Sequence, residues 1–166
     1  QTLPSFTSLH GIKGGAVCKA EIVVGIARAL GMETLIPPTA TGDVDTDLRA
    51  KAAAALQLLA SNDFVLAHFN GSDEASHRYD YAAKAAFITK IDQEFLQPLA
   101  SRLQEPVKAI VCGDHVTSSV TGKHGDGCTP VVAGYLRSDL LQDKQCTRWQ
   151  PQSYHQILNF LMKESD

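Results

Sequence analysis

The sequence predicts a single α/β domain over residues 1–166, in which helices flank a mostly parallel sheet. Short apolar runs bounded by turn residues occupy positions 64–69, 107–112 and 130–135. Runs of this length and composition are typical of strands buried on both faces. Longer segments with apolar residues at helical spacing precede the first two runs, and this alternation favours a parallel sheet. The chain is also long enough to bury a hydrophobic core.

The first sixty residues are expected to contain two helices and one short strand. Residues 1–15 are rich in glycine and are interpreted as a loop. An apolar stripe predicts a helix over residues 16–30, and residues 34–36 are expected to form a short strand. The polar stretch 39–46 is interpreted as a connector that caps the next helix. That helix is predicted over residues 47–60, which are rich in alanine.

Helical periodicity returns in the second half of the chain. A long helix is predicted over residues 79–104, between the first and second strands. Residues 136–150 show no periodicity and are interpreted as irregular. A final amphipathic helix is predicted over residues 153–163.

Composition and charge exclude several classes of function. A net charge of −3, with no basic stripe, gives no argument for nucleic acid or an anionic membrane as partner. No apolar run approaches the roughly 20 residues of a membrane span. The four cysteines are too far apart for paired zinc-binding motifs, so we expect free thiols and a cytoplasmic location. They are Cys18, Cys112, Cys128 and Cys146.

Candidate metal ligands follow the strand predicted at residues 107–112. Asp114 and His115 stand side by side at its end, and His124 comes nine residues later in a loop of Gly, Ser and Thr. Functional residues of open α/β sheets collect at the carboxyl ends of strands. A carboxylate with imidazoles suits a divalent transition metal better than magnesium or calcium. The alternative is a solvated loop with two unrelated histidines.

A second pair of candidates follows the strand predicted at residues 64–69. Asp73 and His77 are four residues apart, so a helix or compact turn would direct both side chains the same way. The carboxyl ends of parallel strands meet at one edge, so all five candidate ligands are expected to converge. The alternative makes Asp73 a helix N-cap and His77 a surface residue.

Three stretches carry a resemblance to a known family. They read HFNGSDEASHRYDYAAKAAFITKID, VCGDHVTSS and KHGDGCTPVV. This order resembles the cofactor-independent phosphoglycerate mutases, in particular their archaeal-type branch within the alkaline phosphatase superfamily. The resemblance covers residues 4–135. Ser76 stands where the family usually has Gly, and residues 116–118 replace its commoner Ser-Thr-Pro, but the ligands are intact.

The resemblance implies a metal-dependent isomerase of glycolysis. Such an enzyme interconverts 3-phosphoglycerate and 2-phosphoglycerate through a phosphoserine intermediate. Two divalent ions are implied, with manganese preferred because the ligands mix oxygen and nitrogen, and zinc as the second choice. Asp73, His77 and His124 would hold one ion. Asp114 and His115 would hold the other.

Lys13 is a candidate for substrate binding. It lies among glycines, which let a backbone approach a ligand closely, and a lysine can bind phosphate as a point charge. An ordinary solvated lysine is the alternative, because no spacing constrains it.

The nucleophile of the family has no counterpart in this sequence. No predicted strand before residue 16 ends in Asp, and no serine stands in the right context. The resemblance therefore implies the C-terminal part of a metal-dependent phosphatase-like domain, inactive alone and able to dimerise through an exposed sheet edge. Two alternatives remain: another phosphoryl or sulfuryl hydrolase of the superfamily, and a non-catalytic assembly domain with a vestigial metal site.

Overall fold

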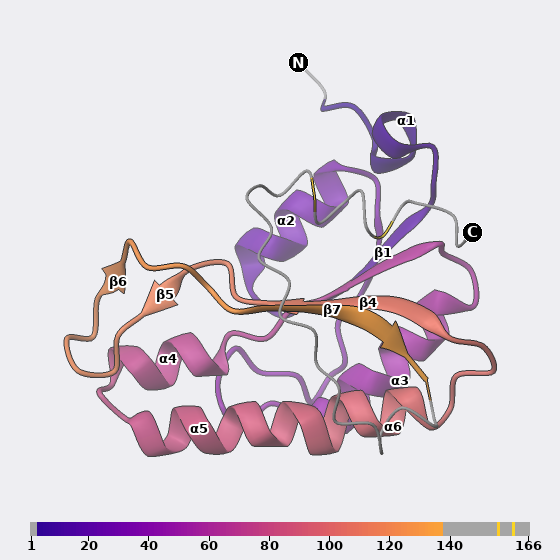
Figure 1. Ribbon diagram of the computed structural model, residues 1–166. Coiled ribbons are helices and arrows are strands. Elements are labelled where there is room, and N and C mark those ends of the chain that lie inside the picture. The colour runs from indigo at the N-terminus through magenta and orange to yellow at the C-terminus, as the bar shows by residue number, and fades with distance from the viewer. Residues whose placement is uncertain (1–2, 138–155, 157–160, 162–166) are drawn as a thin grey trace.

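The computed structural model describes residues 3–137, together with residues 156 and 161. Strands run through its centre and helices cover them on two sides (Figure 1). The predicted α/β class, with a parallel sheet and flanking helices, is confirmed. The expected helix over residues 153–163 and most of the irregular segment 136–150 lie outside the described residues.

A parallel sheet of three strands organises the N-terminal half. Its strands are β1 (Gly14–Val17), β2 (Glu33–Leu35) and β3 (Phe64–Ala67), in the order β2-β1-β3. Both neighbours of β1 run parallel to it. The β2 and β3 strands were predicted, whereas β1 was not.

The sequence prediction missed β1 because its glycines suggested a loop. All four residues of β1 are buried. A Cβ atom at Gly15 would lie 3.2 Å from three side-chain atoms of Leu58, and one at Gly14 would lie 2.8 Å from the Phe6 ring. Glycine at these positions therefore lets neighbouring side chains press directly onto the strand.

Three helices accompany this sheet. They are α1 (Phe6–His10), α2 (Glu21–Ala29) and α3 (Leu48–Leu59). The first was not predicted, and the second begins after β1 instead of at residue 16. Asp47 is the N-cap of the third, and its carboxylate accepts a hydrogen bond from the Ala50 amide at 2.9 Å. This bond, with a second from Thr39, lowers the pKa of the Asp47 carboxyl.

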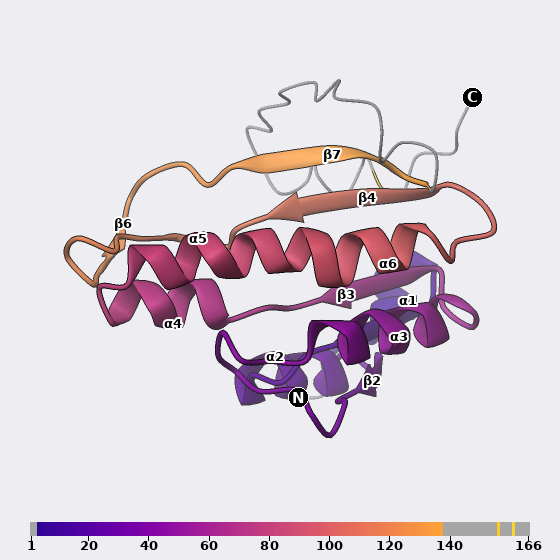
Figure 2. The same ribbon diagram turned by 90° about the horizontal axis from the view of Figure 1, so that it is seen from below.

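One helical rod follows the short helix α4 (Gly71–His77). The rod consists of α5 (Tyr81–Lys90), the π-helical stretch η1 (Ile91–Leu96) and α6 (Gln97–Ala100). Figure 2 shows α5 and α6 as its two ends. The rod is shorter than the predicted helix over residues 79–104. No helix among the described residues is long and apolar enough to cross a bilayer.

Two antiparallel pairs complete the described fold. β4 (Val107–Cys112) pairs with β7 (Val131–Leu136), and β5 (Val116–Thr117) pairs with β6 (His124–Gly125). The bounds of β4 are those predicted. The expectation that residues 107–112 and 130–135 join the parallel sheet is wrong, because β4 and β7 form a separate antiparallel pair. A parallel return needs a long crossover, usually helical, and the connection from β4 to β7 contains only the β5–β6 hairpin.

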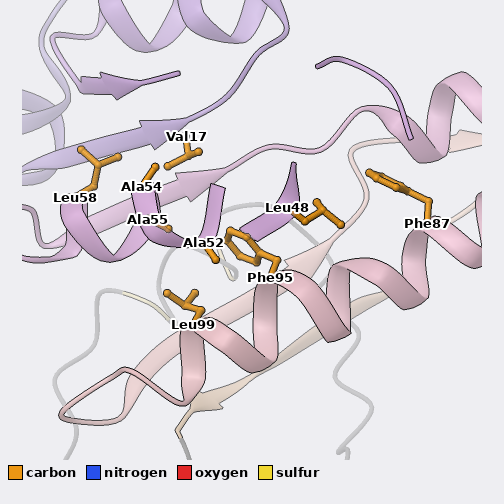
Figure 3. Packing of buried hydrophobic residues seen from close by; sticks show 9 residues of the cluster. All are labelled: Val17, Leu48, Ala52, Ala54, Ala55, Leu58, Phe87, Phe95 and Leu99. Carbon is orange, nitrogen blue, oxygen red and sulfur yellow. The ribbon is translucent and has the colours of Figure 1, made fainter. Parts of the chain in front are cut away.

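The larger hydrophobic core lies between the parallel sheet and the helical rod. Phe95 and Leu99 point from the rod toward α3, where Ala52 and Ala55 leave room for them (Figure 3). Leu58 and Val17 extend the same cluster to β1, and both are fully buried. A smaller cluster around Phe6, Ala16 and Val24 packs α1 and α2 against the other face of β1. The two clusters hold the carboxyl edge of the sheet in place.

Lys51 is the one charged residue among the largest fully buried side chains of the described residues. Its ammonium donates a hydrogen bond to the carbonyl of His68 at 2.9 Å and lies 5.1 Å from the centre of the Phe69 ring. Burial lowers the pKa of Lys51, because the charged form is poorly solvated in the core. The contact joins α3 to the backbone that leads from β3 into α4.

Candidate metal centre

Asp73 and His77 face one another along α4. Three residues separate the end of β3 from the start of this helix, which lies at the carboxyl edge of the parallel sheet. The i, i+4 spacing directs both side chains to one face, and Asp73 Oδ2 lies 3.3 Å from His77 Nε2. Asn70 is the residue that precedes the helix, so Asp73 lies inside the first turn and is not the N-cap.

His124 reaches this pair from the β5–β6 hairpin. Its Nε2 atom lies 3.3 Å from His77 Nε2 and 3.7 Å from Asp73 Oδ1. One ligand atom from each of the three residues lies within 4.8 Å of the others. We call Asp73, His77 and His124 the three-ligand cluster.

The backbone of the hairpin loop fixes the ring of His77. His77 Nδ1 lies 2.8 Å from the carbonyl oxygen of Gly122, which can only accept a hydrogen bond. Nδ1 therefore carries the proton, and the lone pair of Nε2 faces Asp73 and His124. Hydrogen bonds of this kind orient histidine ligands in metalloproteins, so the cluster fits a metal ion.

Gly122 and Tyr79 keep that carbonyl in position. Gly122 has φ 64°, and a Cβ atom there would lie 3.0 Å from the Tyr79 ring, so only glycine fits. Tyr79 itself has φ 61°. Its amide bonds to the carbonyl of Ser76, and the next amide, of Asp80, bonds to Ala75, which ends α4 in a Schellman motif. A tyrosine at this left-handed position is unusual and places its ring against the loop.

Asp114 and His115 lie beside the three-ligand cluster. The ring centroids of His115 and His124 are 4.0 Å apart. His115 Nε2 lies 3.5 Å from Asp114 Oδ2, and its Nδ1 lies 3.1 Å from the hydroxyl of Thr117. The structure thus gathers all five expected ligands in one region. Among the described residues, Asp114 and His115 do not form a three-ligand group of their own.

Lys13 lies at the other edge of the sheet. It directly precedes β1, whereas the three-ligand cluster follows the carboxyl end of β3, and the two strands are parallel. Its backbone is tied to Asp63, whose carboxylate accepts from the Lys13 amide at 2.9 Å. The structure does not bring Lys13 to the cluster.

Sequence reasoning missed the polar residues that support the ligands. Thr117 donates a hydrogen bond to Asp73 Oδ1 at 2.5 Å, and Lys84 donates to the carbonyl of Thr117 at 2.8 Å. The one available signal was that Thr117 stands two residues after His115, on the same side of an extended chain. Ser76, a departure from the family pattern, is buried and donates to the carbonyl of Ser72 at 2.8 Å.

The donor set favours a transition metal over magnesium or calcium. One carboxylate and two imidazoles mix oxygen with nitrogen, whereas magnesium and calcium prefer oxygen alone. The side chains of Asp73, His77 and His124 are 23%, 39% and 56% exposed. Three protein ligands with an open side are the arrangement of catalytic sites that also bind a substrate.

Comparison with known proteins supplies the family. A profile described as the Metalloenzyme superfamily matches residues 1–148. The chain belongs to this superfamily. The matched range contains the parallel sheet, α4 and both antiparallel pairs, so every candidate ligand lies within it.

Its curated relatives bear the name expected from the resemblance. A 2,3-bisphosphoglycerate-independent phosphoglycerate mutase of Ignicoccus hospitalis is 38% identical over 130 residues, which are 78% of this chain and 31% of the relative. The enzyme of the same name from Saccharolobus islandicus is 36% identical over 141 residues, 85% of this chain and 34% of the relative. This superfamily member therefore spans about a third of the length of these relatives.

Two solved structures resemble the chain. The PH0037 protein from Pyrococcus horikoshii superposes with a TM-score of 0.76 at 30% identity, covering 84% of this chain and 43% of that one. A cofactor-independent phosphoglycerate mutase from Thermoplasma acidophilum gives a TM-score of 0.51 at 29% identity, with 68% and 26% covered. The resemblance of the sequence to the phosphoglycerate mutases is confirmed.

Proposed function

We propose that this chain supplies the metal-binding part of a cofactor-independent phosphoglycerate mutase. Its substrate would be phosphoglycerate, and it would act in the cytoplasm with other enzymes of glycolysis. The observation that carries this proposal is the three-ligand cluster, in which Asp73, His77 and His124 converge within 4.8 Å. The names of the relatives supply the substrate.

The proposal assigns two ions to the five candidate ligands. Asp73, His77 and His124 hold one ion, preferably Mn²⁺ and otherwise Zn²⁺. Asp114 and His115 contribute to the second. When bound, such ions neutralise phosphoryl charge and polarise the oxygens of the transferred group. The chain's own contribution is to orient the ligands, through the Gly122 carbonyl for His77 and through the β5–β6 pairing for His124.

The activity test compares this chain with the full-length natural protein. The proposal places the serine nucleophile outside residues 1–166, and covalent phosphoryl transfer needs that nucleophile. With Mn²⁺ present, the full-length protein is expected to convert 3-phosphoglycerate to 2-phosphoglycerate, followed by phosphorus NMR. This chain alone is expected to give no turnover.

The outcomes of this activity test distinguish the proposed function from its alternatives. Turnover by residues 1–166 alone would contradict the placement of the nucleophile. Hydrolysis of phosphate or sulfate esters by the full-length protein, without mutase activity, would favour another hydrolase of the superfamily. A full-length protein with neither activity, and with no affinity for Mn²⁺, would favour a non-catalytic domain with a vestigial site.

We also propose that the chain self-associates through a sheet edge. Within the described residues, β2 and β3 are the two outer strands of the parallel sheet, and each pairs with β1 on one side. Strands bonded on one side present amide and carbonyl groups that pair readily with another strand. Analytical ultracentrifugation of this chain is expected to show a dimer whose fraction rises with concentration. A monomer across the micromolar range would contradict the proposal.

A further inference from the structure

The strongest unassigned feature lies between the two groups of candidate ligands. Thr117 is 5% exposed and belongs to neither group. Its hydroxyl contacts both: it lies 2.5 Å from Asp73 Oδ1 and 3.1 Å from His115 Nδ1. A buried hydroxyl with two such partners has a defined hydrogen-bonding pattern.

The proton positions follow from the chemistry of the three groups. An ionised carboxylate only accepts hydrogen bonds, so the single proton of the Thr117 hydroxyl goes to Asp73. The hydroxyl oxygen can then only accept from His115, whose Nδ1 must carry a proton. The neutral His115 ring is therefore left with an unprotonated Nε2, directed toward Asp114 at 3.5 Å.

The backbone of Thr117 is also fixed by hydrogen bonds. It pairs with His124 across the β5–β6 hairpin. Its carbonyl accepts a hydrogen bond from the Lys84 ammonium at 2.8 Å, which ties the hairpin to α5. The position of Thr117 is thus set by two elements other than its own strand, so its hydroxyl meets Asp73 and His115 at a fixed place.

We propose that Thr117 is a positioning residue that links the two metal sites. Its hydroxyl fixes the Asp73 carboxylate in the three-ligand cluster and keeps His115 in the tautomer that can bind a metal through Nε2. The inference rests on the proposed function for its metal ions, but the tautomer of His115 does not depend on any metal. Removing a hydrogen bond that orients a ligand typically lowers metal affinity about 10- to 100-fold.

The test uses Thr117→Val, which keeps the shape of the side chain and removes the hydroxyl. Thr117→Ser restores the hydroxyl. Thr121→Val is a matched control in the same hairpin, because the Thr121 hydroxyl accepts a hydrogen bond from the Lys123 amide at 3.4 Å and, among the described residues, from no candidate ligand. Nitrogen NMR of the histidine rings, recorded without metal at pH 8.5, reports the tautomer, because the chemical shifts of Nδ1 and Nε2 differ according to which nitrogen carries the proton. Titration with Mn²⁺ reports the affinity of the cluster.

We expect the wild type, Thr117→Ser and Thr121→Val to show His115 protonated at Nδ1. In Thr117→Val the proton of His115 is expected to move from Nδ1 to Nε2, where it can form a hydrogen bond to the Asp114 carboxylate. The same substitution is expected to weaken Mn²⁺ binding about tenfold. An unchanged tautomer in Thr117→Val would overturn the role in orienting His115. A changed tautomer with unchanged Mn²⁺ affinity would overturn the link to Asp73. Absence of Mn²⁺ binding in the wild type itself would overturn the proposed function and the link between metal sites, whereas the tautomer result would stand.

Discussion

Replacing His77 by alanine is expected to lower the affinity of the chain for Mn²⁺ at least about 100-fold. Loss of a hydrogen bond to a ligand already costs about 10- to 100-fold, and this substitution removes the ligand itself. His77 Nε2 lies 3.3 Å from both Asp73 Oδ2 and His124 Nε2, so two ligands would remain without the atom that completes the cluster.

Calorimetry of the wild type and the variant measures this effect. His10→Ala is the matched control, because His10 lies on α1 against Phe6 and far along the chain from the cluster. The control is expected to bind Mn²⁺ as the wild type does. Equal affinities in the wild type and His77→Ala would show that the bound ion is held elsewhere.

Replacing Leu58 by alanine is expected to lower the free energy of unfolding by about 3 kcal/mol, within the 2–5 kcal/mol typical of buried leucines. Leu58 is fully buried and packs on the bare backbone of Gly15. Truncation therefore opens a cavity directly under β1, the central strand of the parallel sheet. The surrounding glycine has no side chain that could fill the space.

Urea unfolding followed by circular dichroism measures the loss. Leu66→Ala on the neighbouring strand β3 is the control, because this leucine is 38% exposed whereas Leu58 is fully buried. We expect the control to lose less than about 1 kcal/mol, as substitutions at exposed sites usually do. Equal losses in the two variants would contradict the packing described for Leu58.

Elements with a clear apolar run or a clear helical spacing could be predicted from the sequence. The apolar run of β4 was recognised with its observed bounds, and the helix spacing of Asp73 and His77 correctly placed both side chains on one face. The expectation that the loops after β3 and β4 meet is confirmed by the hydrogen bond from Thr117 to Asp73. These features depend on local periodicity and on the rule that strand ends carry functional side chains.

Other features depend on tertiary packing and left no local signal. The glycines of β1 suggested a loop until their contacts with Phe6 and Leu58 were known. The antiparallel direction of β7 depends on a hairpin too short to recognise in sequence. Tyr79 adopts the left-handed conformation that glycine usually adopts at the end of a helix, so the sequence contains no glycine that would predict the end of α4.

The central claim is that Asp73, His77 and His124 bind one divalent metal ion. Crystals of this chain soaked with Mn²⁺, with anomalous diffraction recorded at the manganese edge, test it directly. We expect an anomalous peak within bonding distance of an Asp73 carboxylate oxygen, His77 Nε2 and His124 Nε2. Manganese bound at other residues, with no anomalous peak between these three side chains, would contradict it.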